Sequence, residues 1–207
     1  MKRILVPLIL IAGFNTFAQD IPGHYVLEGV RETASELFLR PPGTFEYTLI
    51  YGAADFSAKG AWRYEKGFVV LNSVSDGRPA FRLVQSRVVR SPGIRVRVHG
   101  AGGRPVENIE VALRTKNGLS EGRTAEGGIA KFSDVRGAAV DVVFRVPVYQ
   151  FESERFPLNS AHNDFEFEIN GEAIMQVHFK DERLQVDGTS LELRYWNKNE
   201  PFRYRKQ

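Results

Sequence analysis

Residues 94–132 read IRVRVHGAGGRPVENIEVALRTKNGLSEGRTAEGGIAKF. The first six residues alternate apolar and charged side chains, so they predict a strand with one buried face. A second alternation begins at Ile109, and Gly127 and Gly128 form a turn signal before a short third run at 129–132. Strands joined in this way predict the front half of a small β-sandwich.

Two segments of this stretch resemble a known module. Residues 103–111 read GRPVENIEV, which fits G-x-P-V-x-N-x-x-V, and residues 124–132 read TAEGGIAKF. In this order they resemble the carboxypeptidase regulatory-like, or transthyretin-like, sandwich module. The resemblance implies that the first segment joins two strands and that the second is a tight turn before a core aromatic side chain. It also implies a structural or binding accessory rather than a catalyst.

The segments that follow supply further strands of the same kind. Alternation is clear at 140–146, 151–156 and 163–169, and Pro147 ends the first of these runs. About seven short strands with such connections predict a sandwich of Greek-key character over residues 94–169.

The first 18 residues have the pattern of a secretory signal peptide. Lys2 and Arg3 precede an apolar run from Ile4 to Phe14, and a short segment ends in the small residue Ala18. The run is shorter than the roughly 20 residues that span a membrane, so no stable membrane anchor is expected. We predict cleavage after Ala18 and a periplasmic or secreted protein. The chain has no cysteine, which excludes disulfides and a lipid on an N-terminal cysteine.

The charge of the chain gives little support to a nucleic-acid partner. The formal net charge is +3, and loss of Lys2 and Arg3 with the signal peptide lowers it to +1. Apart from Arg203, Arg205 and Lys206 near the end, no run is strongly cationic. We expect that run to be a solvated tail, and we expect no nucleic acid as a partner.

Residues 21–90 form a separate set of predicted strands. An opening strand at 23–29 is followed by two hairpins, whose turns lie at 41–43 (Pro-Pro-Gly) and 65–67 (Glu-Lys-Gly), and a further strand begins at Phe81. The order of glycines and aromatic residues resembles the small lipocalin-like barrels of bacterial envelope proteins, such as the NlpE type. That type carries a lipid-bearing cysteine and a C-x-x-C motif, and this chain has neither, so metal sensing through thiols is not implied.

The strands before residue 90 number about five or six, too few for a barrel of about eight. Residues 173–206 supply more candidates, at 174–179, 183–186, 191–195 and 202–205. We therefore interpret the fold as all-β, a lipocalin-like meander barrel built from residues 21–90 and 173–206, with the Greek-key sandwich inserted between them. The alternative is two domains in series, in which the last strands belong to the sandwich.

The polar residues do not form a recognisable catalytic or metal-binding pattern. No two histidines stand at a ligand spacing, so no metal or cofactor is expected. Ser160 and His162 are two residues apart but have no third orienting group, and residues 100–104 are glycine-rich without the ending of a P-loop. Two carboxylate pairs share strand faces, and we expect them to be solvated rather than to face each other across a cleft: Glu152 with Glu154, and Glu166 with Glu168. The histidines are His24, His99, His162 and His178.

Aromatic residues at alternating positions of the predicted barrel strands are the candidate ligand-binding residues. In a small barrel such side chains either fill the interior or line a pocket for an apolar ligand, and filling is the default. Phe56, in the segment 52–59 that we expect to be a loop, is a candidate lid or partner contact. The candidate ligand-binding residues are Tyr25, Phe45, Tyr47, Tyr51, Trp62 and Tyr64.

These observations predict an exported, non-catalytic binding or interaction protein of the bacterial cell envelope. An interaction module should show an exposed apolar patch or an unpaired strand edge that fits an envelope protein. The alternative is a carrier of a small apolar ligand, which should have a pocket of roughly 300 Å³ or more at the aromatic residues. A hydrolase ranks third, because it needs convergent residues that the sequence does not display.

Overall fold

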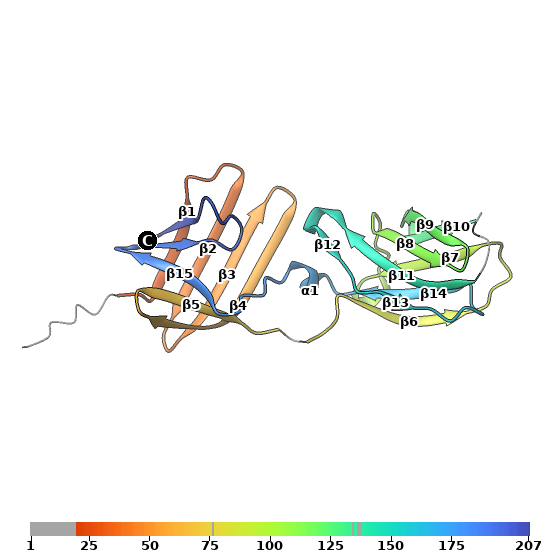
Figure 1. Ribbon diagram of the computed structural model, residues 1–207, viewed down its shortest axis with the longest axis horizontal. Coiled ribbons are helices and arrows are strands. Elements are labelled where there is room, and N and C mark those ends of the chain that lie inside the picture. The colour runs from red at the N-terminus through yellow and green to blue at the C-terminus, as the bar shows by residue number, and fades with distance from the viewer. Residues whose placement is uncertain (1–19, 76, 134, 136–137) are drawn as a thin grey trace, which may run out of the picture.

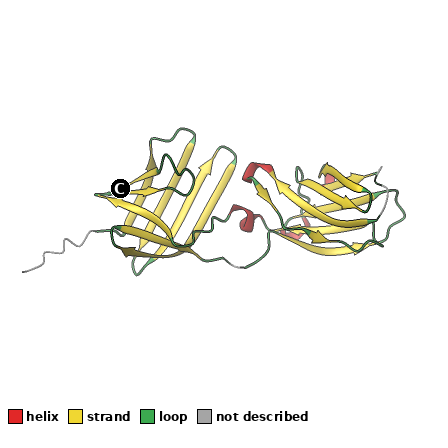
Figure 2. Ribbon diagram, viewed as in Figure 1, coloured by secondary structure: helices red, strands yellow, loops and turns green. Residues whose placement is uncertain are grey.

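The computed structural model describes residues 20–75, 77–133, 135 and 138–207, and these residues form two units side by side (Figure 1). One unit is a closed barrel of eight antiparallel strands, and the other consists of two packed sheets. Strands dominate both units and the helices are short (Figure 2). The predicted all-β fold, a barrel together with a sandwich, is confirmed. The proposed signal peptide lies outside the described residues.

The barrel strands follow one another in chain order around the wall, and the last strand pairs with the first. This closure leaves no free sheet edge. Five strands come from the N-terminal part of the chain and three from its end. They are β1 (Gly23–Glu28), β2 (Thr33–Arg40), β3 (Thr44–Tyr51), β4 (Ala54–Glu65), β5 (Phe68–Ser73), β15 (Glu182–Asp187), β16 (Ser190–Leu193) and β17 (Phe202–Lys206).

Antiparallel order places the connections alternately at the two ends of the barrel. The β1–β2, β3–β4 and β16–β17 connections therefore share one end with the two segments that lead to and from the other unit. We call this end the mouth. Alternation along each strand, as in Phe45, Tyr47 and Leu49 of β3, turns every second side chain into the barrel core.

The sandwich has one sheet in the order β10-β7-β14-β6 and a second in which β12 and β13 both pair with β11, followed by β8 and β9. Strands β7 and β14 are parallel. Aromatic side chains from both sheets fill the core; Phe81 and Phe144 stack with their ring centroids 4.4 Å apart. The strands are β6 (Phe81–Arg87), β7 (Ile94–His99), β8 (Glu110–Thr115), β9 (Gly118–Arg123), β10 (Ile129–Phe132), β11 (Ala139–Val146), β12 (Phe151–Glu152), β13 (Phe156–Pro157) and β14 (Asp164–Ile169).

Strand β6 belongs to the sandwich, which corrects the predicted barrel range of 21–90. It pairs with β14 from Phe81 to Arg87, and Phe81 is only 1% exposed within the sandwich core. A strand with one apolar face looks the same in sequence whichever core it covers, so alternation could not assign it. The barrel residues before the insertion end with β5.

The segment 174–179 is not a strand, which is a second correction. Residues Gly171–Met175 form the short helix α1, and the chain then runs extended along β4, where the Val177 N–H donates to Ser57 O at 2.8 Å. Val177 and Phe179 are buried in the barrel core. The returning chain thus completes the wall beside the half of β4 that does not pair with β5.

Candidate functional site

Side chains fill the barrel interior, with a hydrogen-bonded polar group at its centre. The Ser35 hydroxyl donates to Thr48 O at 2.6 Å and lies 2.8 Å from the Tyr204 hydroxyl, while Trp196 Nε1 donates to the Tyr47 hydroxyl at 2.8 Å. Burial raises the pKa of Tyr47 and that of Tyr204. Each polar atom of this group has a partner, as a buried polar group requires.

A cavity of about 600 Å³ lies at the mouth, between the barrel and the sandwich. We call it the mouth cavity. This volume is in the range of small-molecule sites, roughly 300–1,000 Å³. Arg31 adds a positive charge to a lining that is largely apolar and aromatic, and Thr33, Asn197 and Gln150 add neutral polar groups. The apolar lining consists of Val30, Leu49, Tyr51, Ala54, Phe56, Trp196 and Phe202 from the barrel, and Val148 and Tyr149 from the sandwich.

Aromatic rings lead from the barrel core to the sandwich through this cavity. The Phe56 ring centroid lies 5.0 Å from that of Trp196 and 5.6 Å from that of Tyr149, the latter pair edge-to-face. Tyr195, which is 42% exposed, links this series to the barrel core, since its ring lies 5.2 Å from Trp196 and 5.1 Å from Phe179. These are favourable separations for aromatic pairs, and they place the ring of Phe56 between the two units.

The sandwich reaches the mouth through the 3-10 helix η3 (Pro147–Tyr149), seen in Figure 2 close to the β3–β4 hairpin. This helix ends at Gln150, whose φ of 50° is left-handed and whose N–H donates to Pro147 O at 3.0 Å. Non-glycine residues pay a conformational cost there, and such costs concentrate at functional sites. Within the described residues the Gln150 carboxamide has no hydrogen-bond partner, so it is available to a molecule in the mouth cavity.

The six predicted ligand-binding residues are not brought together. Three of them, Tyr25, Phe45 and Tyr47, are at most 2% exposed and fill the barrel core. Tyr51 is 63% exposed and lines the mouth cavity. The other two lie toward the opposite end: Trp62 donates through Nε1 to Arg40 O at 3.0 Å, and Tyr64 is 47% exposed.

Sequence reasoning missed most of the mouth cavity. Phe56 is not in a loop, because β4 starts at Ala54 and directs Phe56 toward the mouth. Trp196 lies in the β16–β17 connection, where the Asn197 carboxamide accepts two backbone N–H bonds and shapes the turn. The adjacent aromatic residues in that connection are the sequence feature that could have indicated a site there. No sequence feature indicated that Tyr149 belongs to it.

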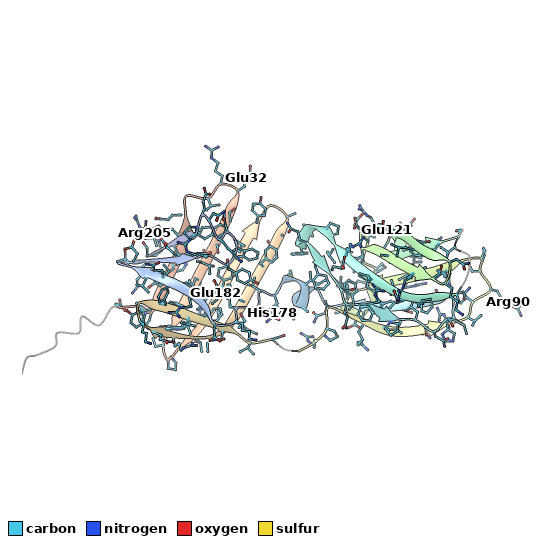
Figure 3. All side chains as sticks on the ribbon, in the orientation of Figure 1. Glu32, Arg90, Glu121, His178, Glu182 and Arg205 are labelled. Carbon is cyan, nitrogen blue, oxygen red and sulfur yellow. The ribbon has the colours of Figure 1, made fainter. Side chains whose placement is uncertain are left out.

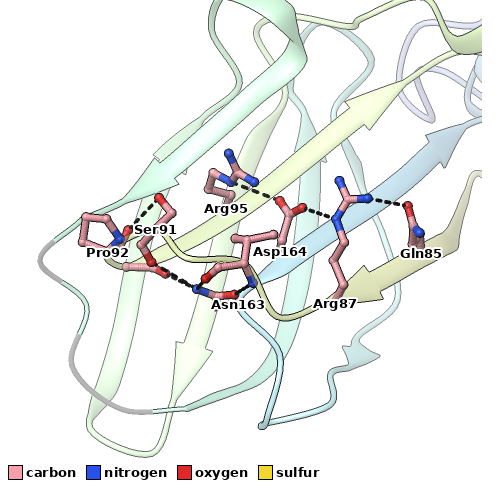
Figure 4. Close-up of polar contacts among 9 residues, drawn as sticks. Gln85, Arg87, Ser91, Pro92, Arg95, Asn163 and Asp164 are labelled. Atoms are coloured by element: carbon pink, nitrogen blue, oxygen red, sulfur yellow. Dashed lines mark hydrogen bonds and ion pairs between the residues drawn. The ribbon is translucent and has the colours of Figure 1, made fainter.

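The most connected polar cluster is in the sandwich, and its role is structural (Figure 4). Buried Asp164 accepts from Arg87 Nε at 2.9 Å and from Arg95 Nε at 3.1 Å, which joins β14 to both neighbouring strands. The adjacent Asn163 amide donates to three carbonyls of the β6–β7 connection, namely those of Val89, Ser91 and Gly93. Every charged or polar group is satisfied, which leaves none directed at a ligand.

The histidines and carboxylates that could suggest chemistry form at most separate pairs, His99 with half-buried Glu166 at 3.4 Å and His24 with Glu36 at 3.3 Å. His162 Nδ1 lies 2.8 Å from Ser86 Oγ rather than beside Ser160. Glu152 pairs with Arg145 and Glu168 with Arg82, each on an exposed strand face. In the part of the chain that the structure describes, no three His, Asp or Glu side chains are grouped as a metal site would require.

No helix among the described residues is both long and apolar enough to cross a membrane. No protein-family model matches the chain, and neither a curated protein nor a solved structure is similar to it.

Proposed function

We propose that this chain is a non-catalytic binding protein that holds a small apolar molecule in the mouth cavity. The observation that carries the proposal is the position of Phe56, between Trp196 and Tyr149 in a cavity of about 600 Å³. Apolar and aromatic walls with a few polar groups are typical of small-molecule sites. The walls favour a molecule with an aromatic or aliphatic body, and Arg31 adds one cationic group to the lining.

Exposure of the apolar lining supports the proposal. Tyr51 is 63% exposed and Val148 is 48% exposed, and both face the mouth cavity. A bound apolar molecule would remove such surfaces from water, which stabilises the complex by about 25 cal/mol per Å² of apolar area. The interior of the barrel is packed, so the ligand binds at the mouth rather than inside.

A fluorescence titration with N-phenyl-1-naphthylamine tests this proposal, because the probe is small, neutral and bright only in apolar surroundings. We expect saturable binding that Ala54→Phe abolishes, since Ala54 is 3% exposed in the cavity wall and a larger ring would fill the space. The matched control is Ala34→Phe, which puts the same ring on the exposed face of β2. Equal binding by both variants would refute a site at the mouth.

A second pair of variants guards against an effect of Ala54→Phe on folding. Phe56 and Tyr64 lie on the same strand, β4, but only Phe56 lines the mouth cavity. Phe56→Ala should weaken probe binding, whereas Tyr64→Ala should leave it unchanged. Circular dichroism of each variant checks that the strands are intact.

We further propose that the protein acts in the bacterial cell envelope after export. The support is the pattern of residues 1–18, a short basic segment followed by an apolar run and Ala18. Expression of the full chain in a Gram-negative host, followed by mass measurement of the periplasmic product, tests it. An intact N-terminus in the cytoplasmic fraction would contradict the proposal.

A second candidate function is docking of an envelope protein on the edge of the sandwich. Among the described strands, β6 pairs only with β14, and the apolar residues Leu83, Val84 and Val88 in and just after β6 are exposed. An open edge of this kind can accept an added strand. The register shift opposite Glu166 and Phe167 interrupts that edge, so the mouth cavity is the stronger site.

A further inference from the structure

The walls of the mouth cavity come from both units. Most of the lining belongs to the barrel, and η3 with Gln150 supplies the wall from the sandwich. Among the residues that the structure describes, the ring pair that joins the two units is Phe56 with Tyr149. Domains of one chain are expected to change their relative orientation unless a large apolar interface holds them.

The two connections between the units lie close together, and α1 of the returning connection lines a common cavity with η3. The chain leaves the barrel after β5 and returns through α1, and Figure 1 shows both crossings below the β3–β4 hairpin. The two crossings are tied together, because Gln176 Nε2 donates to Val74 O at 2.7 Å. Hinges between domains are a few residues in loops or at the ends of elements, and these two connections are the positions at which the units could turn.

The hinge point lies between Ile174 and Val177. Ile174 is 6% exposed and buried in the sandwich core, so α1 moves with the sandwich. Val177 is 3% exposed in the barrel core, so the segment that follows moves with the barrel. Gln176 forms a bridge with Ser57 of β4, so a rotation between the units would be absorbed where Met175 joins Gln176.

We propose that the sandwich is a hinged wall of the mouth cavity, so that a bound apolar molecule fixes the barrel and the sandwich in one relative orientation. This inference rests on the proposed binding function and adds its regulation. With the cavity empty, the units also sample orientations in which Tyr149 has left Phe56.

A ligand shifts a conformational equilibrium only if it binds one state more tightly than the other. Here the closed state adds Val148, Tyr149 and Gln150 to the surface that contacts the ligand. Loss of the Tyr149 ring should therefore weaken probe binding by about tenfold, the effect of losing about one well-packed aromatic contact. The ligand thereby controls how the sandwich is presented to any partner of the barrel or of the envelope.

The test measures a distance across the mouth with spin labels. The chain has no cysteine, so two engineered cysteines are labelled without ambiguity. Figure 3 shows suitable positions on the same side of the molecule: Glu32 on the barrel and Glu121 on the sandwich. Glu32→Cys/Glu121→Cys would be measured by double electron–electron resonance with and without N-phenyl-1-naphthylamine, alone and combined with Tyr149→Ala or with Leu119→Ala as the control.

We expect a broad distance distribution that narrows when the probe saturates the protein. Tyr149→Ala should bind about tenfold more weakly and keep a broad distribution at saturation, while Leu119→Ala, with its exposed side chain far from the cavity lining, should behave like the parent. Saturable probe fluorescence with an unchanged distribution overturns the hinge and leaves the binding function standing. Absence of probe binding overturns the binding function, and the hinge with it.

Discussion

Ile174 and Val177 are three residues apart in the chain, yet each is buried in a different hydrophobic core. Ile174 packs among the sandwich residues at the end of α1, and Val177 packs inside the barrel. The boundary between the two units on the returning chain therefore lies within this short segment.

The first prediction separates the two cores. Ile174→Ala should destabilise the sandwich by about 2–4 kcal/mol, because it deletes buried methyl groups and leaves a cavity. Hydrogen exchange should speed up in β7 and β14, with β2 and β3 unaffected. Val177→Ala should instead destabilise the barrel, so that hydrogen exchange speeds up in β2 and β3 while β7 and β14 are unaffected. Equal effects of either variant on both units would show that they unfold as one.

The second prediction concerns the hydrogen bond between Trp196 and Tyr47. Tyr47→Phe removes the acceptor 2.8 Å from the Trp196 Nε1–H and leaves a partly buried donor without a partner. We expect a loss of about 1–3 kcal/mol in the free energy of unfolding, with a change in tryptophan emission. The control is Tyr51→Phe, because the Tyr51 side chain is 63% exposed at the end of β3.

The third prediction is loss of stability in alkali. Burial, aided by the charge of Asp20, raises the pKa of Tyr25 to about 12, and burial also raises the pKa of Tyr47 and of Tyr204. Below the unfolded value of about 10 all three are neutral in both states, so their contribution is fully present. Above it the unfolded chain loses protons first, and stability falls with rising pH by about 1.4 kcal/mol per pH unit for each tyrosine.

Urea unfolding between pH 9 and pH 12 checks the sign and the slope of this dependence. Tyr204→Phe should make the decline of stability with pH shallower. The variant has one fewer buried hydroxyl group that the unfolded chain deprotonates more readily than the folded chain. A stability that rises over this range would contradict the burial of these hydroxyl groups. Tyrosinate absorbance followed in parallel should increase as the chain unfolds.

The fourth prediction isolates the left-handed backbone at Gln150. Gln150→Gly should stabilise the fold by about 1 kcal/mol relative to Gln150→Ala, since glycine adopts a φ of 50° without steric cost. Both variants lack the carboxamide, so both should bind the probe less well than the parent. Thermal unfolding and the fluorescence titration together separate the backbone effect from the loss of the side chain.

The fifth prediction compares a buried ion pair with an exposed one. Asp164→Asn should cost about 1–3 kcal/mol, because Arg87 and Arg95 lose a charged acceptor that is only 7% exposed. Glu168→Gln, which breaks an exposed pair with Arg82, should cost less than about 1 kcal/mol. Denaturant titrations of the two variants measure both costs. Similar costs would contradict a structural role for Asp164.

Alternation predicted individual strands well and the division between the units less well. Residues 94–99 and 44–51 were recognisable because each has one buried face and period two. Strand β9 was not recognisable from the sequence, because Gly118–Arg123 has little apolar character. It is held in place by its pairing with β8. Phe81 could cover either core, and only the tertiary pairing with β14 decides which.

The candidate site was harder to predict for a related reason. A pattern tells which side of a strand is buried, so Phe45 and Tyr47 were placed among the inward residues of a barrel. The mouth cavity instead depends on which connections fold back over the barrel end. Trp196 and Tyr149 are in such connections, and no local rule brings them to Phe56.

Closure of the barrel by β1 and β17 has a consequence for the order in which the chain can fold. The barrel needs Phe202–Lys206 to complete its wall, and Lys206 Nζ also donates to the Asp20 carboxylate at 2.7 Å. The sandwich core, apart from Ile174, is complete once residue 169 has been made. During synthesis the inserted unit can therefore form first, while the first five barrel strands wait for partners at the very end of the chain.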